Sequence, residues 1–340
     1  MELRKILVVI PVNADYQERF AKALPGAEIT YACYDKELFA KALPGENVNY
    51  VQFDRLTPQQ LASFDAVVGN PDPAALAKLS GMRLLQLNSS GVPADFLTLR
   101  DSHPGLVLCS ASGAFGQAIS EHMVAVLMML IKRLHEYRDA MWQGAWKSLG
   151  KVISPRGMQV LMVGAGSIGT AFARLMQALG SHTIGVRRTP GGAMDGFDEM
   201  HTYEQLDGLL PRADVVALAV PETAQTINLM DARRFSLMKE GSYLINVGRG
   251  SAVDQEALLE ALRSGRLAGA SIDVTTPEPL PADHPLWQQK NLLLTPHVSG
   301  FYHLKATHDA VVDIACRNLA AFPEGPYISR VDYDTGYRAR

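Results

Sequence analysis

The sequence predicts an α/β protein with two domains, each built on a doubly wound parallel sheet. Two observations support this prediction. The chain has 340 residues, 47% of them hydrophobic, which is too long for one ordinary core and fits two domains of typical size. Short apolar segments alternate with helical patterns in two successive series, an arrangement typical of parallel strands covered by helices on both faces.

The first series extends from residue 3 to about residue 110. Its short apolar segments are expected to be strands: 3–10, 28–32, 48–53, 66–69, 84–88 and 106–109. The segments between them have helical patterns: 16–24, 36–43, 58–64 and 73–79. Pro25-Gly26 and Pro44-Gly45 mark turns.

A long helix over 118–142 is expected to follow. Its apolar residues cover most of its circumference as far as Met129, and charged residues such as Lys132 and Arg133 come after them. A helix that is apolar on nearly all sides must be buried on several of them. We therefore expect this helix to pack between domains, in a subunit interface, or both, and we expect the protein to be a homodimer.

The second series follows a loop that ends at Pro155. Strands are expected over 159–163, 182–186, 215–220, 243–246, 269–272 and 292–295, with helices between them. One more helix, over about 305–322, precedes an irregular tail.

The composition excludes several classes of partner. The formal net charge is −3 and charged residues make up 20% of the chain, so neither nucleic acid nor an acidic membrane surface is expected as a partner. The longest apolar run, 123–131, is far shorter than the ~20 residues that span a bilayer. The apolar segment near the N-terminus suits a buried strand better than a signal peptide. We therefore expect a soluble cytoplasmic protein.

The three cysteines, Cys33, Cys109 and Cys316, are widely spaced and have apolar neighbours. An odd number at such spacing argues against a disulfide framework and against a metal site. We expect buried, reduced thiols and no bound metal.

Residues 164–169 read Gly-Ala-Gly-Ser-Ile-Gly, a match to the pattern G-x-G-x-x-G. Alone the pattern is weak, since a tight turn without a ligand would also fit it. Here an apolar strand precedes it and an apolar helix, 170–179, follows it, which is the context of a dinucleotide-binding loop. Gly164 would permit the tight turn, Gly166 the approach of a pyrophosphate, and Gly169 the packing of helix on strand.

Arg187 and Arg188 come directly at the end of the next predicted strand, 182–186. An NAD site usually has an acidic side chain here for the ribose hydroxyls, whereas an arginine would accommodate the 2′-phosphate of NADP. Exposed charges at a strand end would also be ordinary. The sequence favours NADP, with NAD as the alternative cofactor.

Three polar segments of the second series each follow the end of a strand and carry a reactive side chain. These are Arg249 in the first segment, Glu278 in the second and His297 in the third. The carboxyl ends of strands line the ligand crevice of a doubly wound sheet, so these residues are expected to converge. Taken singly, each also has an ordinary explanation as an ion-pair arginine, a loop charge or a strand-end histidine.

Together with a nicotinamide cofactor, the three side chains suit the reduction of a 2-keto acid. Arg249 offers a planar fork that binds a carboxylate and polarises a carbonyl. His297 can give a proton near neutral pH, and Glu278 beside it would favour the imidazolium and hold the ring's orientation. We therefore expect Arg249, Glu278 and His297 to be catalytic.

The chain resembles the D-isomer-specific 2-hydroxyacid dehydrogenases over nearly its whole length. The matching stretches are 88–92, 113–122, 164–169, 246–254, 273–281 and 296–300. Several such motifs in the right order are highly specific. The resemblance implies a flavodoxin-like substrate domain, residues 1–112 with 299–340, and an inserted Rossmann dinucleotide-binding domain, residues 113–298.

The resemblance also implies roles for individual residues. Arg249 would anchor the substrate, His297 would be the general acid and base, and Glu278 its partner. Backbone amides around Ser89, Ser90 and Gly91 would bind the substrate carboxylate, together with Arg249 and His297. The cofactor contacts would be Gly164, Gly166, Ser167, Ile168, Gly169, Arg187, Arg188, Val220, Pro221, Val247, Gly248, Arg249, Asp273, His297, Ser299 and Gly300.

The expected substrate is a small 2-keto acid of the glyoxylate or hydroxypyruvate type, or the matching D-2-hydroxy acid. Two departures from the family pattern matter: Arg187 replaces the ribose-binding acid, and Pro93 stands where many relatives carry an aspartate. Relatives also oxidise formate or phosphite, and corepressors with this fold bind nicotinamide without catalysis. Glu278 and the Ser-Ser-Gly loop favour a 2-hydroxy acid, and the complete catalytic set disfavours a scaffold.

Overall fold

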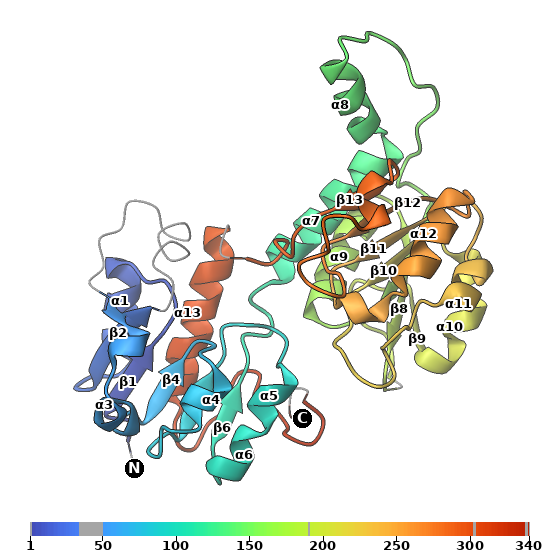
Figure 1. Ribbon diagram of the computed structural model, residues 1–340. Coiled ribbons are helices and arrows are strands. Elements are labelled where there is room, and N and C mark those ends of the chain that lie inside the picture. Colours follow the sequence, from blue (N-terminus) through green and yellow to red (C-terminus); the bar gives the residue numbers. More distant parts are fainter. Residues whose placement is uncertain (1, 34–49, 190, 302–303, 337–338, 340) are drawn as a thin grey trace. The chain divides into compact units, whose positions relative to one another are not determined.

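The computed structural model describes residues 2–33, 50–189, 191–301, 304–336 and 339 (Figure 1). Contacts between Cα atoms divide the chain into two compact units. Unit 1 comprises Met1–Phe115 and Tyr302–Arg340, and unit 2 comprises Gly116–Phe301. Unit 1 contains a sheet of six strands and unit 2 a sheet of seven. The predicted class, α/β with two parallel-sheet domains, is therefore confirmed.

The sheet of unit 1 has the order β3-β2-β1-β4-β5-β6, and all its pairs are parallel. Without the two-residue edge strand β3, the order is flavodoxin-like, 2-1-3-4-5. The strands are β1 (Lys5–Val8), β2 (Glu28–Cys33), β3 (Val51–Gln52), β4 (Ala66–Val68), β5 (Leu84–Gln86) and β6 (Val107–Cys109). Leu7, Val67, Leu85 and Leu108 are fully buried, as expected for a sheet covered on both faces.

The helices of unit 1 are α1 (Ala14–Ala23), α3 (Pro58–Ala62), α4 (Pro73–Leu76), α5 (Ala94–Leu97), α6 (Leu99–Ser102) and α13 (Lys305–Ala320). Asn13 caps α1, because its side chain accepts a hydrogen bond from Tyr16 N. α1 packs against α13. The helix predicted over 36–43 lies outside the described residues.

Asn318 on α13 connects the C-terminal segment to the sheet of unit 1. Its Nδ2 donates to Gln86 Oε1 (2.6 Å) and to Ile328 O (2.9 Å), and its Oδ1 accepts from Ile328 N (2.6 Å). Gln86 ends β5, and its own side-chain amide donates to Leu87 O (2.7 Å). Both amides are buried, so these bonds satisfy groups that would be costly to bury unpaired. The network fixes the start of the loop that follows β5.

The sheet of unit 2 has the order β13-β12-β11-β10-β7-β8-β9. The strands are β7 (Gln159–Val163), β8 (His182–Arg187), β9 (Glu199–Thr202), β10 (Val215–Leu218), β11 (Ser242–Asn246), β12 (Leu267–Ile272) and β13 (Leu292–Leu294). From β7 the chain proceeds outward to β8 and β9 and then returns to β10. The carboxyl ends of β7 and β10 therefore flank the switch point where sheets of this kind bind ligands.

The sequence did not predict β9. Its four residues read Glu-Met-His-Thr, without an apolar run, and all four are half-buried. A short edge strand of this composition lacks both the alternation and the hydrophobic run by which strands are recognised. It pairs with β8, where Arg187 lies opposite Thr202.

The helices of unit 2 are α7 (Gly116–Ile131), α8 (Leu134–Trp142), α9 (Ser167–Ala178), α10 (Leu206–Leu209), α11 (Ala232–Leu237) and α12 (Gln255–Arg263). Short 3-10 turns complete the two units at Phe53–Arg55, Tyr203–Gln205, Leu210–Arg212, Gly250–Ala252 and Pro285–Gln288. α7 packs along α9 and on β11 and β12.

The prediction of a single helix over 118–142 is wrong, because α7 ends at Ile131 and α8 begins at Leu134. Arg133 between them has φ 58° and ψ 30°, a left-handed conformation that cannot continue a right-handed helix. Its guanidinium pairs with both oxygens of Glu136 (Nε–Oε1 2.7 Å, Nη2–Oε2 2.6 Å) and also donates to Leu149 O. α8 and the loop after it extend away from the sheet of unit 2 (Figure 1).

The cysteines Cys33, Cys109 and Cys316 are all buried, as predicted, and none forms a disulfide. Burial raises the pKa of the Cys109 thiol to about 12 and that of Cys316 to about 11, so both thiols are protonated and unreactive. In the described part of the chain, no helix is long and apolar enough to cross a membrane. The same residues contain no cluster of side chains arranged to hold a metal ion.

Candidate active site

The loop after β7 has the geometry that its glycine pattern predicts. Gly164 adopts a φ of +103°, and a β-carbon on it would lie 2.5 Å from Ala219 O. A β-carbon on Gly169 would collide with the carbonyl of Gly164, so strand and helix are too close there for any side chain. Gly166 is exposed, and a β-carbon on it would meet no atom within 4 Å. The loop therefore leaves open space at Gly166.

α9 starts at this open space, with Gly166 as its N-cap, and continues for 12 residues. The first-turn amides of Ser167, Ile168 and Gly169 have no acceptor within the helix. These amides and the positive end of the helix dipole attract an anion. The start of α9 thus fits the pyrophosphate of a dinucleotide.

Arg187, the last residue of β8, is half-buried. Its Nη1 lies 3.4 Å from Met194 Sδ, and its guanidinium fills the space that a side chain on Gly191 would need. Its Nε is buried and has no hydrogen-bond partner among the residues that the structure describes. Because an unpaired buried donor is costly, an anionic ligand would be favoured here. Arg188 beside it is exposed.

The carboxyl ends of β10, β11, β12 and β13 lie side by side along the carboxyl edge of the sheet, where all its parallel strands end. The main-chain ladder continues beyond the strands through three hydrogen bonds of 3.0, 2.9 and 3.1 Å, from Val247 N to Leu218 O, Asp273 N to Asn246 O, and Thr295 N to Ile272 O. The three predicted catalytic segments therefore begin next to one another, as expected from the topology.

Arg249 lies in a tight turn after β11 that Asn246 holds together. Asn246 Nδ2 donates to Arg249 O (2.9 Å), and its Oδ1 accepts from Gly248 N (3.0 Å). The half-buried Arg249 donates from Nη1 to Gly248 O (2.8 Å). A β-carbon on Gly250 would collide with the backbone of Thr275, so this turn packs directly against the segment that carries Glu278.

His297 and Glu278 form a hydrogen-bonded pair at the same edge. His297 Nδ1 lies 2.9 Å from Glu278 Oε2, and the two side chains are 52% and 40% exposed. Glu278 Oε1 accepts a hydrogen bond from Thr275 N (3.0 Å), so both carboxylate oxygens are held. Because Nδ1 is engaged by the carboxylate, Nε2 is the ring nitrogen left to exchange a proton with a substrate.

Asp273 holds the loop that carries His297. His297 has a left-handed φ of 54°, which is uncommon for a residue other than glycine. Its N donates to Asp273 O (2.7 Å). The buried Asp273 carboxylate accepts four more hydrogen bonds, from Thr295 Oγ1, Val298 N, Ser299 N and Ser299 Oγ. The sequence did not mark this role, because every partner lies 22 to 26 residues away.

The remaining predicted cofactor contacts lie in the same loops. Val220 and Val247 are buried and Pro221 is exposed. A β-carbon on Gly248 would lie 2.7 Å from the backbone of Val220, so the loops after β10 and β11 are in close contact. Gly300 follows the His297 loop and is half-buried.

The predicted substrate residues Ser89, Ser90 and Gly91 belong to unit 1, where they follow β5 and are half-buried. Ser89 O accepts from Ala111 N (2.9 Å), and Ser89 Oγ donates to Gly91 O (2.7 Å). The amides of Ser90 and Gly91 have no acceptor among the described residues. Adjacent free amides of this kind suit a carboxylate.

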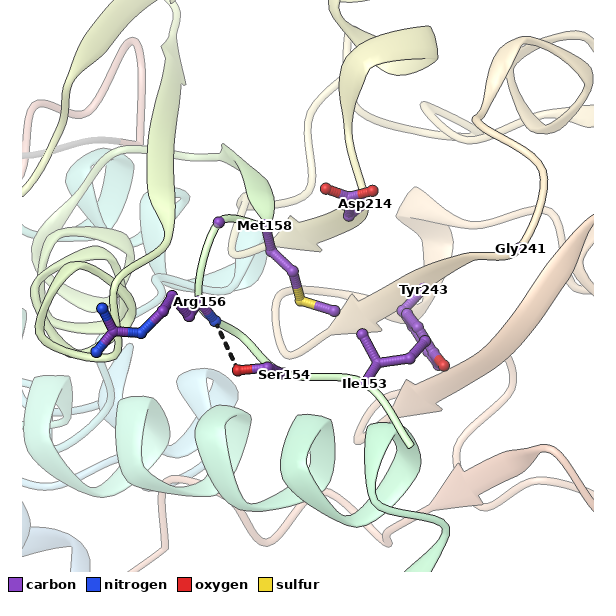
Figure 2. A pocket seen from close by; sticks show the side chains of 8 residues that line it. Ile153, Ser154, Arg156, Met158, Asp214, Gly241 and Tyr243 are labelled. Atoms are coloured by element: carbon purple, nitrogen blue, oxygen red, sulfur yellow. Dashed lines mark hydrogen bonds between the residues drawn. The ribbon is translucent and has the colours of Figure 1, made fainter. Parts of the chain in front are cut away.

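A cavity of about 240 Å³ lies elsewhere in unit 2, at the amino ends of β7, β10 and β11. Figure 2 shows Met158, Ile153 and Tyr243 around it. Its acidic residue, Asp214, already accepts from Gln159 N (2.8 Å) and from Lys239 Nζ (2.5 Å). Ligands of doubly wound sheets bind at the opposite, carboxyl edge, so this cavity is not the candidate active site.

Residues 124–299 match the family model described as D-isomer specific 2-hydroxyacid dehydrogenase, NAD binding domain. The chain belongs to the D-isomer specific 2-hydroxyacid dehydrogenase family. The match covers most of unit 2 and contains the glycine loop, Arg249, Glu278 and His297. The predicted family is thereby confirmed.

Individual relatives agree with this assignment. A D-isomer specific 2-hydroxyacid dehydrogenase family protein from Aeromonas salmonicida has a similar structure, with a TM-score of 0.80, 32% identity, and coverage of 98% of this chain and 100% of that one. The D-isomer specific 2-hydroxyacid dehydrogenase from Xanthobacter autotrophicus, in complex with NADPH and MES, gives a TM-score of 0.76 at 25% identity, covering 99% and 100%. A glyoxylate reductase from Thermofilum pendens is 31% identical over 230 residues, which are 65% of this chain and 66% of the relative.

This 2-hydroxyacid dehydrogenase is therefore an oxidoreductase that uses a nicotinamide dinucleotide, NAD or NADP. Most of unit 2 lies within the match to the NAD binding domain, residues 124–299. The glycine loop and the start of α9 fit the cofactor's pyrophosphate, and at the end of β8 the Nε of Arg187 has no partner among the residues that the structure describes.

Proposed function

We propose that this dehydrogenase reduces a small 2-keto acid of the glyoxylate or hydroxypyruvate type to the corresponding D-2-hydroxy acid. The observation that supports it most directly is the 2.9 Å pair between His297 and Glu278. The pair lies at the sheet edge that also carries the Arg249 turn and the dinucleotide loop. The relative from Thermofilum pendens is named a glyoxylate reductase. Glyoxylate is a small 2-keto acid, which supports a small substrate for this enzyme.

Arg249, His297 and Glu278 have separate roles in the proposed reaction. When bound, the nicotinamide supplies the hydride that adds to C2. Arg249 binds the substrate carboxylate and polarises the C2 carbonyl. His297 gives its Nε2 proton to the carbonyl oxygen, which becomes the product hydroxyl, and the ring becomes neutral. Glu278 is hydrogen-bonded to His297 Nδ1 (2.9 Å) and holds the ring in place.

A panel of substrates tests this proposal. Glyoxylate, hydroxypyruvate, pyruvate and a bulkier branched keto acid are assayed with NADH and NADPH, and formate and phosphite with the oxidised cofactors. We expect turnover of the small keto acids, because each has a carboxylate for Arg249 beside a carbonyl for His297. Turnover of formate or phosphite alone would contradict the proposal. Cofactor binding without any turnover would instead support a non-catalytic scaffold.

We also propose that NADPH is preferred over NADH. Arg187 stands where an acid would bind the ribose hydroxyls, and its Nε is buried and without a partner among the described residues. A 2′-phosphate carries roughly −1.5 to −2 charges, and one charge-assisted hydrogen bond contributes about 1.5–3 kcal/mol, which is about tenfold or more in preference. The Xanthobacter relative was crystallised with NADPH.

The expected result is a modest preference for NADPH in kcat/KM at moderate salt. Arg187→Asp combined with Arg188→Ala should reverse it, because the new carboxylate repels the phosphate and binds the ribose hydroxyls of NADH. Arg233→Ala is the control, since Arg233 on α11 is exposed and already pairs with Asp207 on α10 (2.7 Å). A wild-type preference for NADH above tenfold would contradict this assignment.

We further propose a homodimer that uses α8 and the loop after it. The sequence placed the interface on 118–142 because of its apolar first turns, but Met123 and Leu127 are already buried inside unit 2. The exposed apolar side chains lie further along, and their exposed fractions are 52% for Leu134, 61% for Met141, 74% for Trp142 and 103% for Trp146. Exposed aromatic surface of this kind is typical of interfaces, and closed homodimers are the commonest assemblies.

The projecting loop is fixed to α8 before any partner binds. Leu149 N donates to Tyr137 Oη (3.0 Å), and Arg133 donates to Leu149 O. Sedimentation at micromolar concentration should therefore show a dimer. Trp142→Glu combined with Trp146→Glu should give monomers, whereas Trp287→Glu, an exposed tryptophan outside this segment, should not. A monomeric wild type would refute the proposal.

We place the enzyme in the cytoplasm. The three cysteines are buried thiols without disulfides, which is usual in a reducing compartment.

A further inference from the structure

We propose that Asn70 is a positioning residue that fixes the substrate loop, residues 89–91. This inference rests on the proposed function and on the expectation, drawn from the family resemblance, that the amides of that loop help Arg249 bind the substrate carboxylate. Asn70 follows β4 and belongs to none of the family motifs. Its Nδ2 donates to Ser89 Oγ (2.9 Å), and its Oδ1 accepts from Asn88 N (2.9 Å). One side chain therefore holds two successive residues where the substrate loop begins.

The backbone at Asn70 is itself fixed. Gly69 has a φ of +127°, and a β-carbon on it would lie 2.7 Å from Val9 O, so only glycine fits between the ends of β1 and β4. Gly69 N donates to Gln86 O (2.8 Å), which ties the end of β4 to the end of β5. Pro71 is buried and restricts Asn70 to an extended backbone. The amide of Asn70 thus reaches the substrate loop from a rigid position.

Hydrogen bonds continue from Asn70 across the loop. Because Ser89 Oγ accepts from Asn70 Nδ2, its own proton is free to bond Gly91 O at 2.7 Å. The hydrogen bonds from Asn70 to Ser89 and from Ser89 to Gly91 close the loop around Ser90. Ser89 O is held from the other side by Ala111 N (2.9 Å). This arrangement fixes the direction of the Ser90 and Gly91 amides, and fixed donors bind an anion without a cost for ordering them.

Only an amide side chain supplies both interactions. Asn70 needs a donor for Ser89 and an acceptor for Asn88. In Asn70→Asp the new carboxylate would attract the Ser89 hydroxyl proton away from Gly91 O. It would also add a negative charge close to the site of the substrate carboxylate. In Asn70→Ala both bonds are lost and no charge is added.

The test compares wild type with Asn70→Ala, Asn70→Asp, Ser89→Ala and the double alanine variant, using hydroxypyruvate. Asn70→Ala should raise KM about tenfold, the equivalent of about one hydrogen bond, with kcat changed less than about threefold. Asn70→Asp should raise KM further, and added salt should reduce that extra effect. The two alanine changes should be non-additive, because they break the same chain of hydrogen bonds.

Two controls separate positioning from damage to the fold. Cofactor affinity should stay unchanged in every variant, since the dinucleotide loop lies in unit 2. Gln60→Glu makes the same amide-to-carboxylate change in unit 1, at a cap of α3 that needs only the Oε1 acceptor for Thr57 N (2.9 Å). Its kinetic constants should match wild type.

The outcomes distinguish this inference from the proposed function. A KM within twofold of wild type in both Asn70 variants would overturn the role of Asn70 and leave the function intact. A lower melting temperature together with weaker cofactor binding in the Asn70 variants would show a general structural role. That result would also overturn the proposed role of Asn70. A wild type that turns over no 2-keto acid would overturn the proposed function, and the role of Asn70 with it.

Discussion

Replacing His297 by alanine should lower kcat for a 2-keto acid by about 10²–10⁴-fold, because the proton donor for the new hydroxyl is lost. Cofactor affinity should stay close to wild type, since the loop that fits the pyrophosphate is a separate segment, 164–169. The measurement is kcat under conditions limited by chemistry, together with a cofactor titration. Glu278→Gln should lower kcat less, because the imidazole remains and its partner loses only the negative charge.

His201→Ala is a matched control. His201 Nε2 also pairs with a carboxylate, Glu199 Oε2 at 3.0 Å, on β9, the edge strand farthest from β12 and β13. Hydrogen bonds from Arg212, His201 and His182 lower the pKa of Glu199 to about 2, so two partners remain in the variant. Its turnover should be within threefold of wild type. If His297→Ala were equally active, His297 would have no part in the mechanism.

Arg249→Lys should lower kcat/KM by about a hundredfold or more, because an ammonium cannot reproduce the planar fork that binds a carboxylate with two hydrogen bonds. KM and kcat should both change, since the guanidinium binds the ground state and polarises the carbonyl in the transition state. Steady-state constants for one keto acid, compared with wild type at saturating cofactor, measure the effect.

Arg212→Lys provides the comparison for this change. Arg212 also makes a two-pronged contact, with both oxygens of Glu199 at 2.6 and 3.2 Å. A lysine there would lose the same fork geometry, yet turnover should be unaffected because Glu199 takes no part in the reaction. Unchanged constants in Arg249→Lys would show that the substrate carboxylate is anchored elsewhere.

Features that depend on local sequence were predictable. Each glycine of the pattern 164–169 has one local property that its type predicts. Gly164 permits the turn, Gly166 leaves space for a ligand, and Gly169 lets the helix pack closely on the strand. The placement of Arg249, Glu278 and His297 after strands was enough to bring their segments together, because a parallel sheet aligns the carboxyl ends of its strands. The two α/β series were recognisable for the same reason, since buried parallel strands are apolar along their whole length.

Features set by distant partners were not predictable. An arginine does not by itself predict a left-handed backbone. The ion pair of Arg133 with Glu136 and its hydrogen bond to Leu149 O form only in the folded chain. Asp273 bonds a loop more than twenty residues further along. Asn70 reaches a loop 18 to 19 residues away. These side chains position others through tertiary contacts, for which spacing in the sequence carries no signal.

The most direct test of the proposed reaction follows the transferred hydrogen. The enzyme is supplied with NADPH deuterated at both C4 positions and with hydroxypyruvate, and the product is analysed by mass, by NMR and for its configuration. We expect one deuterium at C2 of glycerate and the D configuration. A product without deuterium at C2, or an L product, would contradict it.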